Sequence, residues 1–240
     1  MSNPGSTSSA NEKRRFEFAS LSLLLGLAAA IGTLIFFGWL ADEVLEGETH
    51  HFDEVTRAAV HQLASPLLTT LMRGVSFIGS TLSLSIGTTL VVIRFAMLKW
   101  GREAKLFAIT MIGAGLLNVT LKLAFQRPRP VPFFNLTAPE TYSFPSGHAL
   151  TSACFFGALA AIVTARVKSR RVRAIVWIVC TLMFVLIGFS RIYLGVHHTT
   201  DVIAGFAAAL IWILVVRFVE TGLARRKRRK NRHDLQDATR

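Results

Sequence analysis

Charged residues are scarce in this sequence. They make up 17% of its 240 residues, whereas soluble domains carry about 25%. Hydrophobic residues account for 52% of the chain, and the mean hydropathy is +0.47. A composition this apolar argues against a water-soluble domain and predicts a membrane protein.

Cysteine is nearly absent, and acidic residues are few. Cys154 and Cys180 lie inside apolar runs without a partner motif, so we interpret them as small hydrophobic packing residues. The 27 Lys and Arg residues outnumber the 14 Asp and Glu residues, and the net charge is +13. Such an excess would suit nucleic acid, but no aromatic residue lies between the basic residues of the tail "RRKRRKNR" to offer a stacking surface. We therefore expect no nucleic-acid partner.

Long apolar runs dominate what remains. A membrane-spanning helix needs about 20 mostly apolar residues, and six stretches qualify or nearly qualify: about 18–40, 76–98, 104–124, 148–165, 174–194 and 200–222. The sequence thus predicts an all-α fold, a six-transmembrane-helix bundle over residues 18–222. We expect a disordered cytoplasmic N-terminus over residues 1–17 and a basic cytoplasmic tail over residues 223–240.

The Lys and Arg residues divide unequally between the two sides of these spans. All but six lie on the side that holds both termini and the connections after the second and fourth spans. The six exceptions are Arg57, Arg73, Lys122, Arg127, Arg129 and Arg191. Because cytoplasmic loops hold the excess of Lys and Arg, we predict a multi-pass protein of the cell (inner or plasma) membrane with both termini in the cytoplasm. The basic tail then fixes topology and touches anionic headgroups.

The segment 42–75 joins the first two spans on the extracytoplasmic side. Its apolar residues recur at helical spacing, at Phe52, Val55, Ala59 and Leu63. This pattern predicts an extracytoplasmic amphipathic helix that lies along the outer interface. The stretch "ETHHFDE" within it resembles a metal site, but adjacent histidine rings point in different directions on a helix. We interpret it as a solvated interfacial stretch.

Three polar stretches lie on this same outer side, each at the end of a later span. They read "KLAFQRPRP" (122–130), "PSGH" (145–148) and "SRIYLGVHHTTD" (190–201). Each alone has an ordinary interpretation: a lysine that reaches the headgroups from a helix end, an N-cap at Ser146, and a polar connector. Their occurrence together on one face favours a functional site.

The residue types in these stretches suit a phosphoryl group. Lys122, Arg129 and Arg191 supply three cations, and Gly147 lets backbone N–H groups at a helix start approach an anion closely. Two imidazoles, His148 and His197, come from different spans.

Asp201 follows His197 by one helical turn, where its carboxylate can hold an imidazole N–H and fix the tautomer. These side chains predict a site at the membrane surface, where the bond to be broken belongs to a lipid headgroup.

The complete pattern has three parts: Lys, six residues, Arg-Pro; then Pro-Ser-Gly-His; then Ser-Arg, five residues, His, three residues, Asp. Here it reads Lys122…Arg129-Pro130, Pro145-Ser146-Gly147-His148 and Ser190-Arg191…His197…Asp201. With these motifs, which cover residues 122–201, the chain resembles the type 2 phosphatidic acid phosphatase family of integral-membrane lipid phosphate phosphatases. The six-span layout extends the likeness to about 18–222.

The resemblance implies a role for each motif residue. His197 would be the nucleophile that forms a phosphohistidine, Asp201 would orient it, and His148 would protonate the leaving oxygen and then activate water. The phosphoryl oxygens would be bound by Lys122, Arg129, Arg191, Ser146 and the Gly147 amide. Arg127 would be accessory at most. The family needs no metal and no cofactor, and the sequence agrees, because Glu140 and Asp201 are the only carboxylates near the motifs.

Other activities fit parts of this pattern. Vanadium-dependent haloperoxidases look similar at the motifs but are soluble. A lipid-to-lipid phosphotransferase would use the same site with a different acceptor. A non-enzymatic lipid-binding or transport protein is disfavoured by the intact His148, His197 and Asp201. The motifs recognise only phosphate, so undecaprenyl diphosphate and lipids of the phosphatidic acid or phosphatidylglycerol phosphate type are equally favoured substrates.

Overall fold

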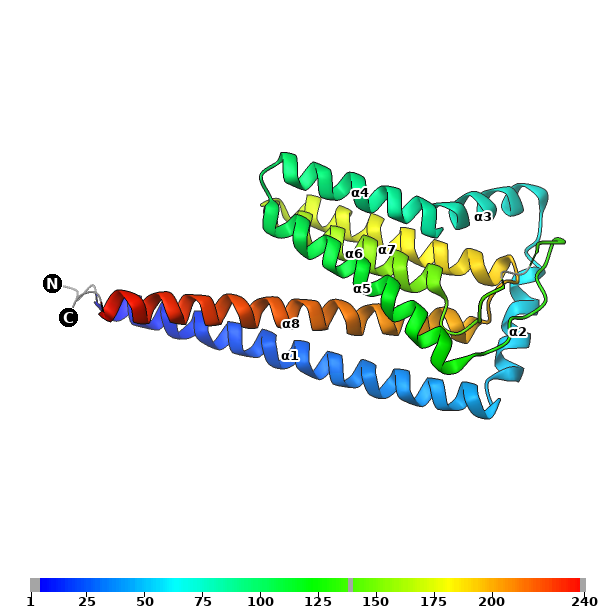
Figure 1. Cartoon of the computed structure of the whole chain (residues 1–240), viewed down its shortest axis with the longest axis horizontal. Helices are drawn as coiled ribbons and strands as arrows, with labels where there is room; N and C mark the ends of the chain where they lie inside the picture. Colours follow the sequence, from blue (N-terminus) through cyan, green and yellow to red (C-terminus); the bar gives the residue numbers. More distant parts are fainter. Residues whose placement is uncertain (1–4, 138–139, 238–240) are drawn as a thin grey trace.

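The computed structural model describes residues 5–137 and 140–237, and this part of the chain forms eight α-helices joined by short connections and one longer loop (Figure 1). Their bounds are α1 Gly5–Glu46, α2 His50–His61, α3 Pro66–Ile78, α4 Thr81–Met97, α5 Gly101–Phe125, α6 Gly147–Arg166, α7 Arg170–Tyr193 and α8 Thr199–Asp237. The predicted all-α fold is confirmed.

Five helices are long and apolar enough to cross a membrane: α5, α6, α7, the part of α1 from Leu25 and the part of α8 up to Ala224. Helices α3 and α4 pass the same test only as a pair, which is bent by 51°. The described residues therefore contain five spans, or six if the bent pair counts as one. The single helix predicted over about 76–98 is wrong in this respect, because the chain turns at Gly79 and Ser80.

The local cause of this bend is visible at both residues. Ser80 adopts an extended backbone and its side chain accepts a hydrogen bond from the Ser83 N–H, so it caps a new helix. A Cβ at Gly79 would lie 2.3 Å from the Ile187 side chain. The glycine thus allows the bend to pack closely against α7.

Helices continue toward both ends of the chain. Helix α1 begins at Gly5 and includes most of the segment 1–17, for which we expected disorder, and residues 1–4 lie outside the described residues. This segment has no proline after Pro4 and contains the helix-favouring Ala, Glu, Lys and Arg, so it extends the first span. The basic tail likewise continues α8 as far as Asp237.

The amphipathic segment 42–75 forms the end of α1, all of α2 and most of α3. Helix α2 has the predicted periodicity, but it turns its polar face to the protein. Phe52 and Val55 are about half exposed, at 49% and 52%, whereas Asp53 is completely buried. Buried polar partners from the loop after α5 and from α8 account for this orientation, as described below.

Helix α6 forms the centre of the bundle, packed against α5, α7 and α8. Small residues let α6 and α8 approach closely, among them Ala153 and Cys154 on α6 and Ala204 and Ala208 on α8. Both cysteines are free and buried, which confirms their interpretation as packing residues. Many large apolar side chains on the outside of the bundle remain exposed, as expected of surfaces that face lipid.

The polar motifs gather at one end of this bundle. That end contains helix α2, the loop after α5, the start of α6 and the turn between α7 and α8, whereas the chain termini and the α4–α5 and α6–α7 turns lie at the other (Figure 1).

Candidate active site

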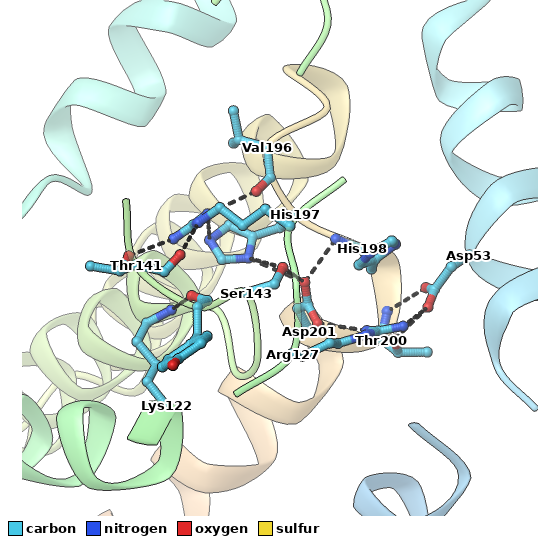
Figure 2. Close-up of polar contacts among 12 residues, drawn as sticks. Asp53, Lys122, Arg127, Thr141, Ser143, Val196, His197, His198, Thr200 and Asp201 are labelled. Carbon is cyan, nitrogen blue, oxygen red and sulfur yellow. Dashed lines mark hydrogen bonds and ion pairs between the residues drawn. The ribbon is translucent and has the colours of Figure 1, made fainter. Parts of the chain in front are cut away.

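His197 and Asp201 form the centre of the polar cluster. His197 lies in the turn before α8 and Asp201 in the first turn of α8, and Nδ1 of the imidazole lies 3.3 Å from Oδ2 of the carboxylate. Oδ2 also accepts hydrogen bonds from the His198 N–H, at 2.9 Å, and from the Ser143 hydroxyl (Figure 2). Because a carboxylate can only accept, we assign the imidazole proton to Nδ1, which leaves the lone pair on Nε2.

The other ring nitrogen of His197 faces a cation. Nη1 of Arg129 donates to Nε2 at 3.1 Å and to the Val196 carbonyl at 2.8 Å. The same guanidinium donates to the backbone and side-chain oxygens of Thr141, at 2.6 and 2.9 Å. Three protein oxygen atoms thus hold this guanidinium beside Nε2 of the imidazole.

Burial keeps this imidazole neutral. His197 is 2% exposed, and desolvation lowers its pKa to about 3, an effect that the hydrogen bond from its Nδ1–H to Asp201 only partly offsets. Burial also lowers the pKa of Arg129, but a guanidinium remains charged at neutral pH. The site therefore combines a neutral nitrogen base with a fixed positive charge.

The other predicted cations reach the same end from the last turns of two helices. Lys122 on α5 is buried and donates to the Tyr142 carbonyl, and Arg191 on α7 is buried and donates to the Ser76 hydroxyl on α3. Lys122 and Arg191 lie close enough to His148 for their charges to act on its imidazole, and so do Arg129 and His197.

The motif Ser146–Gly147–His148 begins helix α6. The Ser146 N–H donates to the Asp201 carbonyl at 2.9 Å, which joins the start of α6 to the start of α8. Ser146 occupies the N-cap position, yet its hydroxyl makes no capping hydrogen bond and has no partner within residues 5–137 and 140–237. Ser146 therefore occupies the N-cap position without the hydrogen bond of an N-cap, and its buried hydroxyl has no protein partner among the described residues.

Gly147 is required by the crowding around it. A Cβ there would lie 2.9 Å from the Asn118 side-chain oxygen on α5, so a larger residue would displace this neighbour. At the α3–α4 bend, a Cβ at Gly79 would lie 3.4 Å from Cδ2 of the His148 ring, so this glycine also lies in contact with a predicted site residue.

All eight predicted site residues lie at one end of the bundle.

Some residues of this cluster were not predicted from the sequence. Arg127, expected to be accessory, donates to Oδ1 of Asp201 at 2.7 Å. Asp53 on α2, Ser143 in the loop and Thr200 on α8 complete the set of buried polar partners. The "RPRP" repeat around Arg127 was one usable signal, but nothing in the sequence relates Asp53 to residues more than 70 positions away.

No metal centre accompanies these groups in the described part of the chain, where no three His, Cys, Asp or Glu residues are placed to hold an ion. In the stretch "ETHHFDE", His50 instead pairs with Glu54 at 3.4 Å, and both side chains are exposed.

The motifs and the fold also match known proteins. The model of the PAP2 superfamily matches residues 103–222. Phosphatidylglycerophosphatase B of Bacillus subtilis is 30% identical over 191 residues, which is 78% of this chain and 92% of that protein. An undecaprenyl-diphosphatase of Sulfolobus acidocaldarius is 34% identical over 120 residues, 48% of this chain and 54% of that protein.

A solved structure supports the same relationship. The crystal structure of a transmembrane PAP2-type phosphatidylglycerolphosphate phosphatase from Bacillus subtilis superimposes with a TM-score of 0.74 at 27% sequence identity. The matched region covers 80% of this chain and 96% of that one.

Proposed function

The chain belongs to the PAP2 superfamily of membrane lipid phosphate phosphatases, a hydrolase family that needs no metal ion, and we propose from this premise that it hydrolyses phosphatidylglycerol phosphate through a phosphohistidine on His197. The observation that carries the proposal is the geometry of that imidazole. Nδ1 faces Asp201, and the Nε2 lone pair accepts from Arg129, so a phosphoryl group whose oxygen took over the arginine hydrogen bond would bring phosphorus next to Nε2.

In the first step, Nε2 of His197 attacks phosphorus. A P–N bond forms and the bond to the lipid oxygen breaks, while His148 donates a proton to that oxygen. Lys122, Arg129 and Arg191, with the Ser146 hydroxyl and the Gly147 N–H, bind the three equatorial phosphoryl oxygens, over which the negative charge is spread in the transition state. Asp201 stabilises the imidazole as it becomes positive.

In the second step, water replaces the imidazole. His148 accepts a proton from the water molecule as its oxygen attacks phosphorus, the P–N bond breaks, and inorganic phosphate leaves. His148 regains its proton and His197 returns to the neutral form that its burial favours. Both steps use groups that the protein itself supplies.

The choice of lipid rests on the relatives. The relative that matches over most of its length is named a phosphatidylglycerophosphatase, which favours a phosphate monoester on a glycerophospholipid. The undecaprenyl-diphosphatase match covers about half of each chain and keeps the polyprenyl diphosphate as a second candidate.

We place the site on the extracytoplasmic face of the cell membrane, with both termini in the cytoplasm. The excess of Lys and Arg at the opposite end of the bundle supports this orientation. The exposed apolar face of α2, at Phe52 and Val55, would then meet the outer lipid interface.

Phosphate release by the purified protein across a lipid panel tests the proposal. The panel contains phosphatidylglycerol phosphate, phosphatidic acid and undecaprenyl diphosphate, with the variant His197→Ala as the inactive control and His50→Ala as the active one. We expect phosphatidylglycerol phosphate to give the highest kcat/KM, a chelator to have no effect, and His197→Ala to lose at least about 10⁴-fold. Near-normal turnover by a folded His197→Ala protein would refute the nucleophile, and transfer of phosphate to a second lipid without its release would replace hydrolysis by phosphotransfer.

A further inference from the structure

A buried acidic residue outside the motifs reaches the start of α8. Asp53 on α2 is completely buried, and its Oδ1 accepts a hydrogen bond from the Thr200 N–H at 2.9 Å. Its Oδ2 accepts from the Thr200 hydroxyl at 2.7 Å. A carboxylate from α2 thus caps the N-terminus of α8, where the helix dipole favours negative charge.

One guanidinium connects this carboxylate to the candidate site. Arg127 donates through Nη2 to Oδ2 of Asp53 at 2.9 Å and through Nη1 to Oδ1 of Asp201 at 2.7 Å (Figure 2). Nη1 also lies 2.9 Å from the Thr200 hydroxyl. The arginine side chain is 13% exposed and the two carboxylates are almost completely buried, so the three groups form a buried network of two negative charges and one positive charge.

In this network the two carboxylate oxygens of Asp201 have different hydrogen-bond partners. Oδ1 is occupied by Arg127, which leaves Oδ2 to the three donors Ser143, His198 N–H and His197 Nδ1–H. If Arg127 were released, Asp201 would lose the hydrogen bond that holds Oδ1 and would share a buried region with the like charge of Asp53, although the charges of Arg57 and Arg129 would still act on Asp201. A carboxylate that rotates, or that takes up a proton to reduce the repulsion, no longer fixes the imidazole tautomer.

We propose that Asp53 and Arg127 are positioning residues for the reaction: together they fix the carboxylate of Asp201, and through it the orientation and tautomer of His197. The proposal rests on His197 as the nucleophile of the proposed function. It makes α2, which lies outside the three motifs, part of the machinery that prepares the nucleophile. The alternative is that the pair only fastens α2 to the bundle.

The chain offers a matched control for that alternative. Thr56 on α2 forms a second hydrogen bond to the start of α8, with 2.7 Å between its hydroxyl and that of Thr199. Thr56→Val removes this contact without a change of shape and leaves Asp201 untouched. Asp53→Asn is the variant aimed at Oδ2, because an asparagine oxygen can still cap the Thr200 N–H, while an NH₂ group in place of Oδ2 cannot accept from Arg127 or from the Thr200 hydroxyl.

The test measures kcat and KM for phosphate release from phosphatidylglycerol phosphate in detergent micelles. We expect Asp53→Asn to lower kcat about 10- to 100-fold, less than the loss of the orienting carboxylate itself would cost, with KM within about threefold. Thr56→Val should stay within twofold of wild type. A folded Asp53→Asn protein with wild-type kcat, or an equal loss in Thr56→Val, would overturn the proposal.

A second variant keeps the test decisive if Asp53→Asn does not fold. Arg127→Lys keeps the positive charge but lacks the planar fork that reaches both carboxylates, so we expect a similar loss of kcat. In the double variant the two losses should overlap, because residues that act through one contact are not additive. Fully multiplicative losses would refute the coupling.

The same assay separates this inference from the proposed function. Wild type must release phosphate and His197→Ala must not. If either control fails, the proposed function is wrong. If both hold and Asp53→Asn and Arg127→Lys match wild type, only the positioning role is wrong.

Discussion

The two ends of the bundle use arginine in opposite ways. At the site end, Arg127, Arg129 and Arg191 are largely withdrawn from solvent and donate to buried or partly buried oxygen atoms. At the other end, Arg102 pairs with Glu220 on α8 at 2.5 Å and Arg166 pairs with Glu103 on α5, and both arginine side chains are far more exposed. Water screens the second kind of contact more than the first, so we expect arginine to contribute little at that end and more at the site end.

The largest contrast between the two ends is expected in the side of the membrane that each one faces. Thr137→Cys places a thiol in the exposed loop at the site end, and Lys168→Cys places one in the α6–α7 turn at the other. A membrane-impermeant maleimide should label the first in intact cells and the second only after permeabilisation. The wild-type protein is the control, because Cys154 and Cys180 are buried. The reverse labelling pattern would place the site in the cytoplasm.

The next largest effect is expected from Arg129 itself. Arg129→Gln removes the cation beside Nε2 of His197 and a ligand for the phosphoryl oxygens, and loss of one such group costs about 10²- to 10³-fold in rate. We expect kcat/KM for phosphate release to fall by this factor.

Arg129→Lys should recover only part of this loss, since an ammonium group cannot contact Thr141, Val196 and the phosphate with the same fork. Wild-type activity in folded Arg129→Gln protein would show that this half-buried arginine is structural.

The sequence indicates the proximity of His197 and Asp201 directly, because the two residues are one helical turn apart. That Lys122, Arg129 and His148 belong to the same site was expected from the three motifs together and from the family that they resemble. The connections between the helices were predicted less well. The break at Gly79 and Ser80 was missed because the apolar runs on both sides of it were taken as one span, although Ser80 caps a new helix and Gly79 lets the bend pack against Ile187 on α7. Hydropathy averages over such a contact and cannot detect it.

Asp53 illustrates the same limit from the polar side. Its position on an amphipathic helix predicted an exposed residue between apolar neighbours, yet it is buried against Arg127 and Thr200. Periodicity identifies the two faces of a helix but not which face the rest of the protein will cover. Here the bonding needs of a buried arginine and of a helix N-terminus decide the orientation, and both partners are distant in sequence.

The smallest effect is expected at the opposite end of the bundle, where the arginine side chains are exposed. Arg166 lies over the Trp100 ring at 4.6 Å and pairs with Glu103, with 45% of its side chain exposed. An exposed ion pair contributes about 0–1 kcal/mol, and an exposed cation–π contact about 0.5–1 kcal/mol. Arg166→Gln should therefore leave kcat/KM within twofold of wild type and lower the thermal unfolding midpoint in detergent by a few degrees at most. A loss of activity near that of Arg129→Gln would mean that the two ends of the bundle are coupled through α6, which carries His148 in its first turn and Arg166 in its last. Burial would then no longer distinguish the arginines that the reaction needs from those that it does not.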